Sequence, residues 1–173
     1  QVSARAVDRN SAFSLGVHSG SYVSGYENGE GYSDFGLGLS LGYRPVETLG
    51  LELSWEHHSE TFDTTTERIA EPLQASVELY AFPWARVSPY VLGGLTWTSR
   101  SVRDSWSDGQ TQRITDVEDT LFGPHAGLGL EFAIGEQASL EMEGRLVNYL
   151  NVADTDASLP AAAQGTIGLN MYF

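Results

Sequence analysis

The stretch AAAQGTIGLNMYF, residues 161–173, follows a strict two-residue period. Its odd positions carry Ala, Gly, Ile, Leu, Met and Phe, whereas polar side chains such as Gln164, Thr166 and Asn170 occupy even positions. Successive side chains of a β-strand point to opposite faces. The stretch is therefore predicted to be a strand that separates two different environments.

The same alternation recurs along the chain and predicts seven further strands. It is regular in residues 35–43, 49–56, 73–81, 127–132 and 140–146, and less regular in residues 13–23 and 87–98. No stretch keeps a 3.6-residue period over three turns, so no helix is expected. A strand content this high is unusual for an ordinary domain and is expected for a closed barrel.

The connections between these strands alternate in length. The short ones, at residues 44–48, 83–86 and 134–137, contain turn-forming residues. The long ones are polar and cover residues 25–32, 60–71, 100–120 and 151–160. This pattern predicts an all-β fold, an eight-stranded antiparallel up-and-down β-barrel with its long loops at one end.

Alternation alone does not say which face of the barrel points inward. A soluble ligand-binding barrel places its apolar face inside. Here the polar face is rich in Gly and Ser beside isolated carboxylates, which suits a narrow lumen. The strands also run to about 10 residues, enough to cross a bilayer at a tilt, and the last one ends in Tyr172-Phe173. These features favour a transmembrane barrel with its apolar face in lipid.

Two segments carry a resemblance to a known family. Residues 165–173 are similar to the alternating, Phe-terminated final strand of the small eight-stranded outer-membrane β-barrels of the OmpA/OmpX type, and residues 87–97 resemble a Pro-Tyr-Val-Gly-x-Gly strand of that family. The resemblance implies a bacterial outer-membrane location with periplasmic turns, extracellular loops and both termini in the periplasm. Residues 1–11 would then be a short periplasmic segment, and residues 12–173 the barrel.

The resemblance also implies the partners of such a barrel. Phe173 is expected to act as the assembly signal for the barrel-assembly machinery, and the wall is expected to contact outer-membrane lipid and lipopolysaccharide. The composition limits other partners: 23 acidic residues face 9 basic ones, all Arg, for a net charge of −14. This charge disfavours nucleic acid. No cofactor or metal is expected.

The alternation places several charged side chains in the lumen. The predicted lumen charge network comprises Arg145, Arg44, Glu52, Glu56, Glu78, Glu131, Glu141 and Glu143. Eight strands leave a lumen filled by side chains, so these charges must pair. The structural interpretation is a network centred on Arg145, and the functional interpretation is a cation-selective path.

Catalytic residues are not expected. His57 and His58 are adjacent on a strand, so they point to opposite faces, and His18 and His125 are isolated candidates for the lumen. Residues 145–151 resemble in placement the strand on which lipid A deacylases carry a His-x-Ser pair. Asn148 and Leu150 stand at those two positions, and neither supplies a general base or a nucleophile.

The connection at residues 100–120 is the candidate surface-recognition loop, through Arg100, Arg103, Asp104, Trp106 and Arg113. The sequence therefore predicts a non-enzymatic outer-membrane barrel with a structural or surface-recognition role and a lumen plugged by charged side chains. The alternative is a membrane-anchored accessory subunit of a larger complex with an envelope protein partner, favoured by breaks in the apolar stripe at Gly93 and Gly144. A small-solute pore, a lipid A-modifying enzyme and a soluble ligand-binding barrel are further alternatives.

Overall fold

The computed structural model describes residues 9–27, 30–63, 66–107, 112–150 and 161–173. Within these ranges, the strand ends at residues 24–27, 30–34, 60–63, 66–68, 102–107 and 112–119 are described by their backbone.

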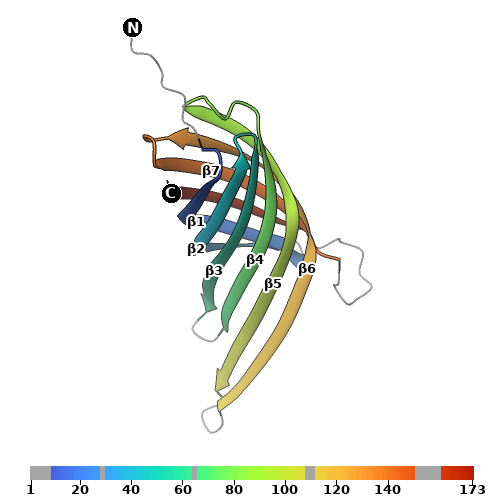
Figure 1. Ribbon diagram of the computed structural model, residues 1–173. Helices are drawn as coiled ribbons and strands as arrows, with labels where there is room; N and C mark the ends of the chain where they lie inside the picture. Colours follow the sequence, from blue (N-terminus) through green and yellow to red (C-terminus); the bar gives the residue numbers. More distant parts are fainter. Residues whose placement is uncertain (1–8, 28–29, 64–65, 108–111, 151–160) are drawn as a thin grey trace.

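Eight strands form one closed antiparallel barrel in which each strand pairs with its neighbours in sequence and β1 pairs with β8 (Figure 1). The strands are β1 (Ala12–Glu27), β2 (Glu30–Val46), β3 (Leu49–Asp63), β4 (Thr66–Tyr80), β5 (Val87–Ser107), β6 (Gln112–Ala133), β7 (Ala138–Asn148) and β8 (Ala161–Tyr172). The predicted fold class is confirmed. Among the described residues, no helix is long and apolar enough to cross a membrane.

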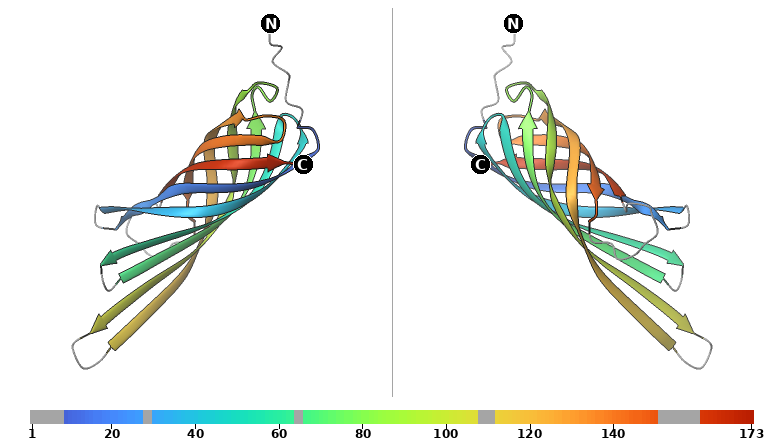
Figure 2. Two further views of the ribbon diagram at one scale, coloured as in Figure 1. Left: turned by 90° about the vertical axis from the view of Figure 1, so that its left-hand side faces the viewer. Right: turned by 90° about the vertical axis from the view of Figure 1, so that its right-hand side faces the viewer.

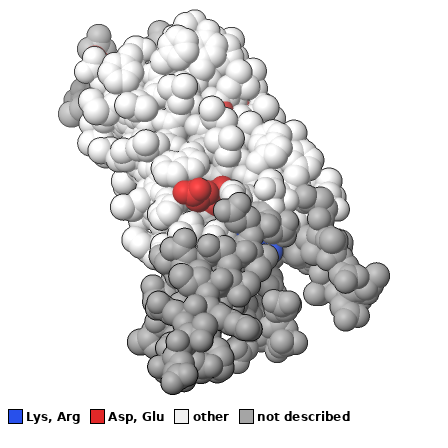
Figure 3. Space-filling view, turned by 90° about the horizontal axis from the view of Figure 1, so that it is seen from below, with Lys and Arg blue, Asp and Glu red and all other residues white. Residues whose placement is uncertain are grey.

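The apolar face of the barrel points outward. Leu37, Leu128 and Leu146 are 66–68% exposed on the outer wall, whereas the charged residues Glu131 and Arg145 are 1% and 6% exposed inside. The described part of the wall in Figure 3 is almost free of charged surface, with one acidic patch beside the grey residues. An apolar outer wall around a polar interior is typical of a transmembrane barrel and excludes the soluble alternative.

The two ends of the barrel differ. We call the end with the connections at residues 47–48, 81–86 and 134–137 the turn end; β1 begins there and β8 ends there (Figures 1 and 2). We call the opposite end, where β1–β2, β3–β4 and β5–β6 are joined, the hairpin end. In Figure 2, β5 and β6 extend furthest at the hairpin end.

Three of the four predicted long loops are mostly strand. Residues 25–32, 60–71 and 100–120 continue the paired hairpins, which leaves connections of only residues 28–29, 64–65 and 108–111. The physical reason is that lipid contact on one side of a strand creates the apolar alternation. Where a strand extends beyond the apolar wall, its sequence loses the regular alternation while the backbone pairing persists. The predicted loop at residues 151–160 lies outside the described residues.

Candidate functional site: the barrel interior and the β5–β6 hairpin

The interior polar residues form three groups along the barrel, and the first lies at the turn end. Glu131 of β6 accepts a hydrogen bond from Arg44 of β2 and forms an ion pair with Arg9, which precedes β1. The guanidinium carbon of Arg44 lies 3.7 Å from the centre of the Tyr80 ring, and that of Arg9 lies 4.1 Å from the centre of the Tyr172 ring. Both arginines are therefore held by a carboxylate and an aromatic face.

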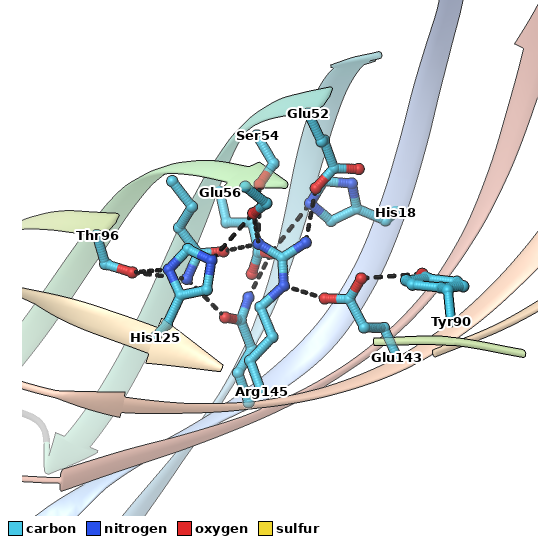
Figure 4. A network of polar contacts seen from close by, with 12 residues as sticks. His18, Glu52, Ser54, Glu56, Tyr90, Thr96, His125, Glu143 and Arg145 are labelled. Atoms are coloured by element: carbon cyan, nitrogen blue, oxygen red, sulfur yellow. Dashed lines mark hydrogen bonds and ion pairs between the residues drawn. The ribbon is translucent and has the colours of Figure 1, made fainter. Parts of the chain in front are cut away.

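The second group surrounds Arg145 of β7 (Figure 4). Its Nη2 donates to Glu52 of β3 at 2.6 Å, and its Nε donates to Glu143, two residues earlier on the same face of β7. Tyr90 OH donates to the other oxygen of Glu143 at 2.9 Å. One guanidinium thus bridges carboxylates from two strands, as its planar fork allows.

The third group surrounds Glu56 of β3, nearer the hairpin end. His18 Nε2 lies 3.0 Å from one carboxylate oxygen, and His58 Nε2 lies 2.6 Å from the other. Glu56 and His58 are 3% and 0% exposed, so this carboxylate is buried between two imidazoles. His18, an isolated candidate in the sequence, meets His58 here because β1 and β3 both flank β2.

Two glutamines connect the second group to the third. Arg145 Nη1 donates to Gln74 Oε1 at 2.5 Å, and Gln74 Nε2 donates to Gln164 Oε1 at 2.9 Å. Gln164 Nε2 in turn donates to Glu56. Because each amide both accepts and donates, this chain orders the barrel centre across β7, β4, β8 and β3.

The interior ends toward the hairpin side in a less polar layer. Tyr22 and Tyr149 share a hydrogen bond, and Thr98 bonds to Tyr149 at 2.8 Å. Three apolar side chains, each 1% exposed, complete the layer: Leu121, Val147 and Ala162. The imidazole of His125 forms hydrogen bonds with Ser76 at 3.0 Å and with Thr96 at 2.8 Å.

Small cavities lie between these groups. Two cavities of about 20 and 10 Å³ lie beside Glu52 and Glu141, enough for about one water molecule each. Carboxylate oxygens of Glu52, Glu78 and Glu143 lie within 4.8 Å of one another. Arg145 donates to two of these carboxylates and Tyr80 donates to the third at 2.8 Å, so the chain itself supplies donors to this cluster.

All eight predicted network residues have side chains inside the barrel, but Arg145 does not contact all of the acids. Glu131 belongs to the Arg9–Arg44 group, and Glu56 belongs to the histidines. Sequence reasoning missed Arg9, Gln74 and Gln164. Gln74 and Gln164 stand at the polar, even-numbered positions of their strands, and this position in the alternation indicates that they face the lumen.

The residues of the candidate recognition loop lie on the β5–β6 hairpin. Arg100 pairs with Asp119, Arg103 with Asp116, Asp104 with Thr115, and Trp106 with Arg113 in the backbone register. These positions are therefore strand rather than loop. The side chains of Arg103, Asp104, Trp106 and Arg113 lie outside the described part of the structure.

Phe173 lies at the seam of the barrel. Its backbone exchanges hydrogen bonds with Phe13 of β1, at 2.9 and 3.3 Å, and its ring is 76% exposed on the outer wall. His57 and His58 point to opposite faces as expected: His57 pairs with Glu71 outside at 2.9 Å, and His58 is buried inside.

Comparison with family models matches residues 1–173 to the family described as "Outer membrane protein beta-barrel domain". The chain belongs to this family. It is 24% identical to outer membrane protein A of Serratia marcescens over 174 residues, which cover 90% of this chain and 45% of that protein. The chain thus spans less than half the length of this relative.

Solved structures of other outer-membrane proteins share the fold. Neisserial surface protein A superposes with a TM-score of 0.72 at 16% identity, covering 94% of this chain and 99% of that one. Ail, the attachment invasion locus protein of Yersinia pestis, superposes with a TM-score of 0.65 at 12% identity, covering 95% and 99%. The chain is a bacterial outer-membrane β-barrel of this small class.

Proposed function

We propose that this outer-membrane barrel is a non-enzymatic surface-recognition protein that presents the β5–β6 hairpin to the outside. The observation that carries the proposal is the length of this hairpin. Its backbone pairing continues from Trp97–Phe122 to Ser107–Gln112. At ~3.3 Å per residue, this is about 30 Å of strand.

We infer from a change in the outer wall where the hairpin leaves the lipid. Trp55, Trp97 and Phe122 lie in one cross-strand row with Leu73, and the rings of Trp97 and Phe122 are 5.2 Å apart. The next row toward the hairpin end carries the exposed His57–Glu71 pair. Aromatic belts mark the interfaces of transmembrane barrels, so the paired strands beyond this row stand outside the membrane.

This interpretation implies an orientation. The turn end and both termini face the periplasm, and the hairpin end faces outward, as is general for barrels with short turns at one end. Lipid and the lipopolysaccharide leaflet then surround the wall, and the barrel-assembly machinery inserts the chain, with Phe173 at its signal position.

The hairpin offers a further means of contact through its backbone. On the side of β6 away from β5, β7 pairs with β6 only at residues 125–133, so no described strand flanks residues 112–119. An edge of this kind accepts an added strand from a partner through main-chain hydrogen bonds. The proposed partner is therefore a protein with an extended segment, contacted also by Arg100, Arg103, Asp104, Trp106 and Arg113.

The interior supports an anchoring role for the barrel. Three interlocked polar groups and a less polar layer occupy it, and its two cavities hold about one water molecule each. We propose that the lumen is plugged. Asn148 and Leu150 are exposed on the outside, and Leu150 is 65% exposed. No nucleophile or general base stands at these two positions to support lipid A hydrolysis.

Shortening the hairpin tests the recognition role. In the variant, residues 102–117 are replaced by an Asn-Gly turn, which closes the Ser101–Glu118 pair. The control replaces residues 24–32 in the same way and closes the Val23–Ser33 pair. Random peptides displayed on phage are selected on the full chain in nanodiscs.

We expect the selected peptides to lose at least about tenfold in affinity for the β5–β6 variant and to bind the β1–β2 control as they bind the full chain. Ail has been crystallised with the heparin analogue sucrose octasulfate. The net charge of −14 of this chain would repel a sulfated polyanion. Equal binding to all three proteins, or no selected peptide at all, would contradict the proposal.

A second candidate function rests on a different observation. Gly144 of β7 and Gly165 of β8 are paired on the outer wall, and a Cβ at either position would meet no atom closer than 4.0 Å. Nothing in the described chain requires these glycines. A small-residue break in the wall suits an accessory subunit that docks a membrane partner. The test is extraction in mild detergent: a stoichiometric companion protein that is lost in the Gly144→Leu variant would favour this candidate.

A further inference from the structure

The chain makes a tight turn at the turn end before it enters the barrel wall. Ala12 N donates to Arg9 O at 3.4 Å, and Ser11 adopts a φ of 57°, a left-handed conformation that L-residues other than Asn and Asp rarely adopt. The backbone is thereby reversed. As a result, the side chain of Arg9 points back into the barrel while the chain continues as β1.

Three contacts fix this turn across the mouth of the barrel. Inside, Arg9 pairs with Glu131 of β6 and lies over the ring of Tyr172 of β8. Outside, Asn10 Oδ1 accepts a hydrogen bond at 3.0 Å from the backbone N–H of Glu47, between β2 and β3. Residues 9–12 therefore join three separate parts of the wall, and we call them the strap.

The seated position of Arg9 is only partly satisfied. The residue is 4% exposed, yet its Nε and Nη2 have no hydrogen-bond partner within the described chain. Burying an unpaired donor costs about 1–3 kcal/mol, and more for a charged group. The ion pair and the aromatic contact offset this cost. The free energies of the buried and the withdrawn position of Arg9 therefore differ by only a small amount.

Glu131 does not depend on Arg9 alone. Its second oxygen is bound by Arg44, which is held on β2 and lies over the Tyr80 ring. If Arg9 withdrew, Glu131 would keep a buried cationic partner and Arg9 would regain water. Withdrawal thus leaves no unpaired charge inside, which is the usual reason that a buried ion pair is hard to open.

We propose that the strap is a reversible closure of the turn end, in which Arg9 seals the interior groups from solvent and can withdraw while Arg44 keeps Glu131 neutralised. The turn end of the barrel would switch between a closed and an open state while the strands of the wall stay folded. The strap would control access to the Glu131 group from the turn end.

The test uses a single cysteine, because the chain contains none. Ser139 is 0% exposed, faces inward and lies at the turn end of β7, next to the Ala133 pairing. Ser139→Cys is introduced into the full chain in nanodiscs. Its rate of reaction with a charged methanethiosulfonate reagent then reports access to the turn end of the interior.

With the natural strap we expect slow labelling, and with Arg9→Met we expect labelling roughly tenfold faster. Arg86→Met is the matched control because Arg86 is an exposed arginine at the same end, and its labelling should equal that of the natural strap. Asn10→Ala removes only the outer contact and should give an intermediate labelling rate. It replaces Arg9→Met in the test if Arg9→Met does not fold. Equally slow labelling of both strap variants, or labelling of the natural strap as fast as that of unfolded protein, would overturn the proposal.

Discussion

Replacing Arg145 with Ala is expected to destabilise the barrel more than any other single truncation of the interior, by about 3–5 kcal/mol. The guanidinium is 6% exposed and donates to Glu52, Glu143 and Gln74. Its removal leaves two carboxylates in a water-poor interior without their cation. The urea midpoint of refolded protein in detergent micelles measures the loss.

The control for this variant is its neighbour on β7. Leu146→Ala changes a side chain that is 68% exposed on the lipid face, and it should cost no more than about 1–2 kcal/mol. Because unpaired charge is the cause, the triple variant Glu52→Gln, Glu143→Gln, Arg145→Met should recover most of the stability lost by Arg145→Ala. Equal unfolding midpoints for Arg145→Ala and Leu146→Ala would show that no such network holds the interior.

Gly94→Ala is expected to destabilise the barrel strongly, by about 1–3 kcal/mol or more. Gly94 faces inward on β5, and an added Cβ would overlap the backbone carbonyl of Ala75 on β4 and approach His125 Cε1 at 2.9 Å. A backbone carbonyl in a closed sheet has no room to move aside. The strands would have to separate at this point.

Gly144→Ala provides the opposite case on the outer wall. A Cβ there meets only Gln164 O, at 4.0 Å, so the substitution should stabilise the barrel by about 0.5–1 kcal/mol through the lower entropy of the unfolded chain. Heat-modifiability on gels and urea midpoints compare the two variants. A loss for Gly144→Ala as large as that for Gly94→Ala would show that the outer glycine has a packing role within the chain.

The strand order and the inward position of the acids could be read from sequence because lipid on one face imposes a two-residue period. Leu51, Leu53 and Trp55 alternate with Glu52 and Ser54 for this reason, and the structure places them on opposite faces. The two-residue period of apolar side chains is present only where one face of a strand contacts lipid. Beyond Trp97 the sequence of the β5–β6 hairpin has no regular apolar alternation, so the sequence of a paired strand resembles that of a loop.

The pairing of interior groups could not be read from sequence. Which side chains meet inside depends on the stagger between strands, and His18 meets Glu56 although 38 positions separate them in the chain. Arg9 was assigned to a segment outside the barrel because nothing in its neighbours signals that the backbone reverses at Ser11. The division of the acids between Arg145 and the Arg9–Arg44 group followed from neither parity nor charge.

We propose that the barrel is plugged and anchors an outward-facing hairpin. The electrical conductance of the refolded full chain in a planar lipid bilayer, compared with a detergent-only control, tests this proposal most directly. We expect no steady current above the control, because each of the two small cavities beside Glu52 holds about one water molecule. A stable, cation-selective conductance would contradict it and make the interior acids the lining of a pore.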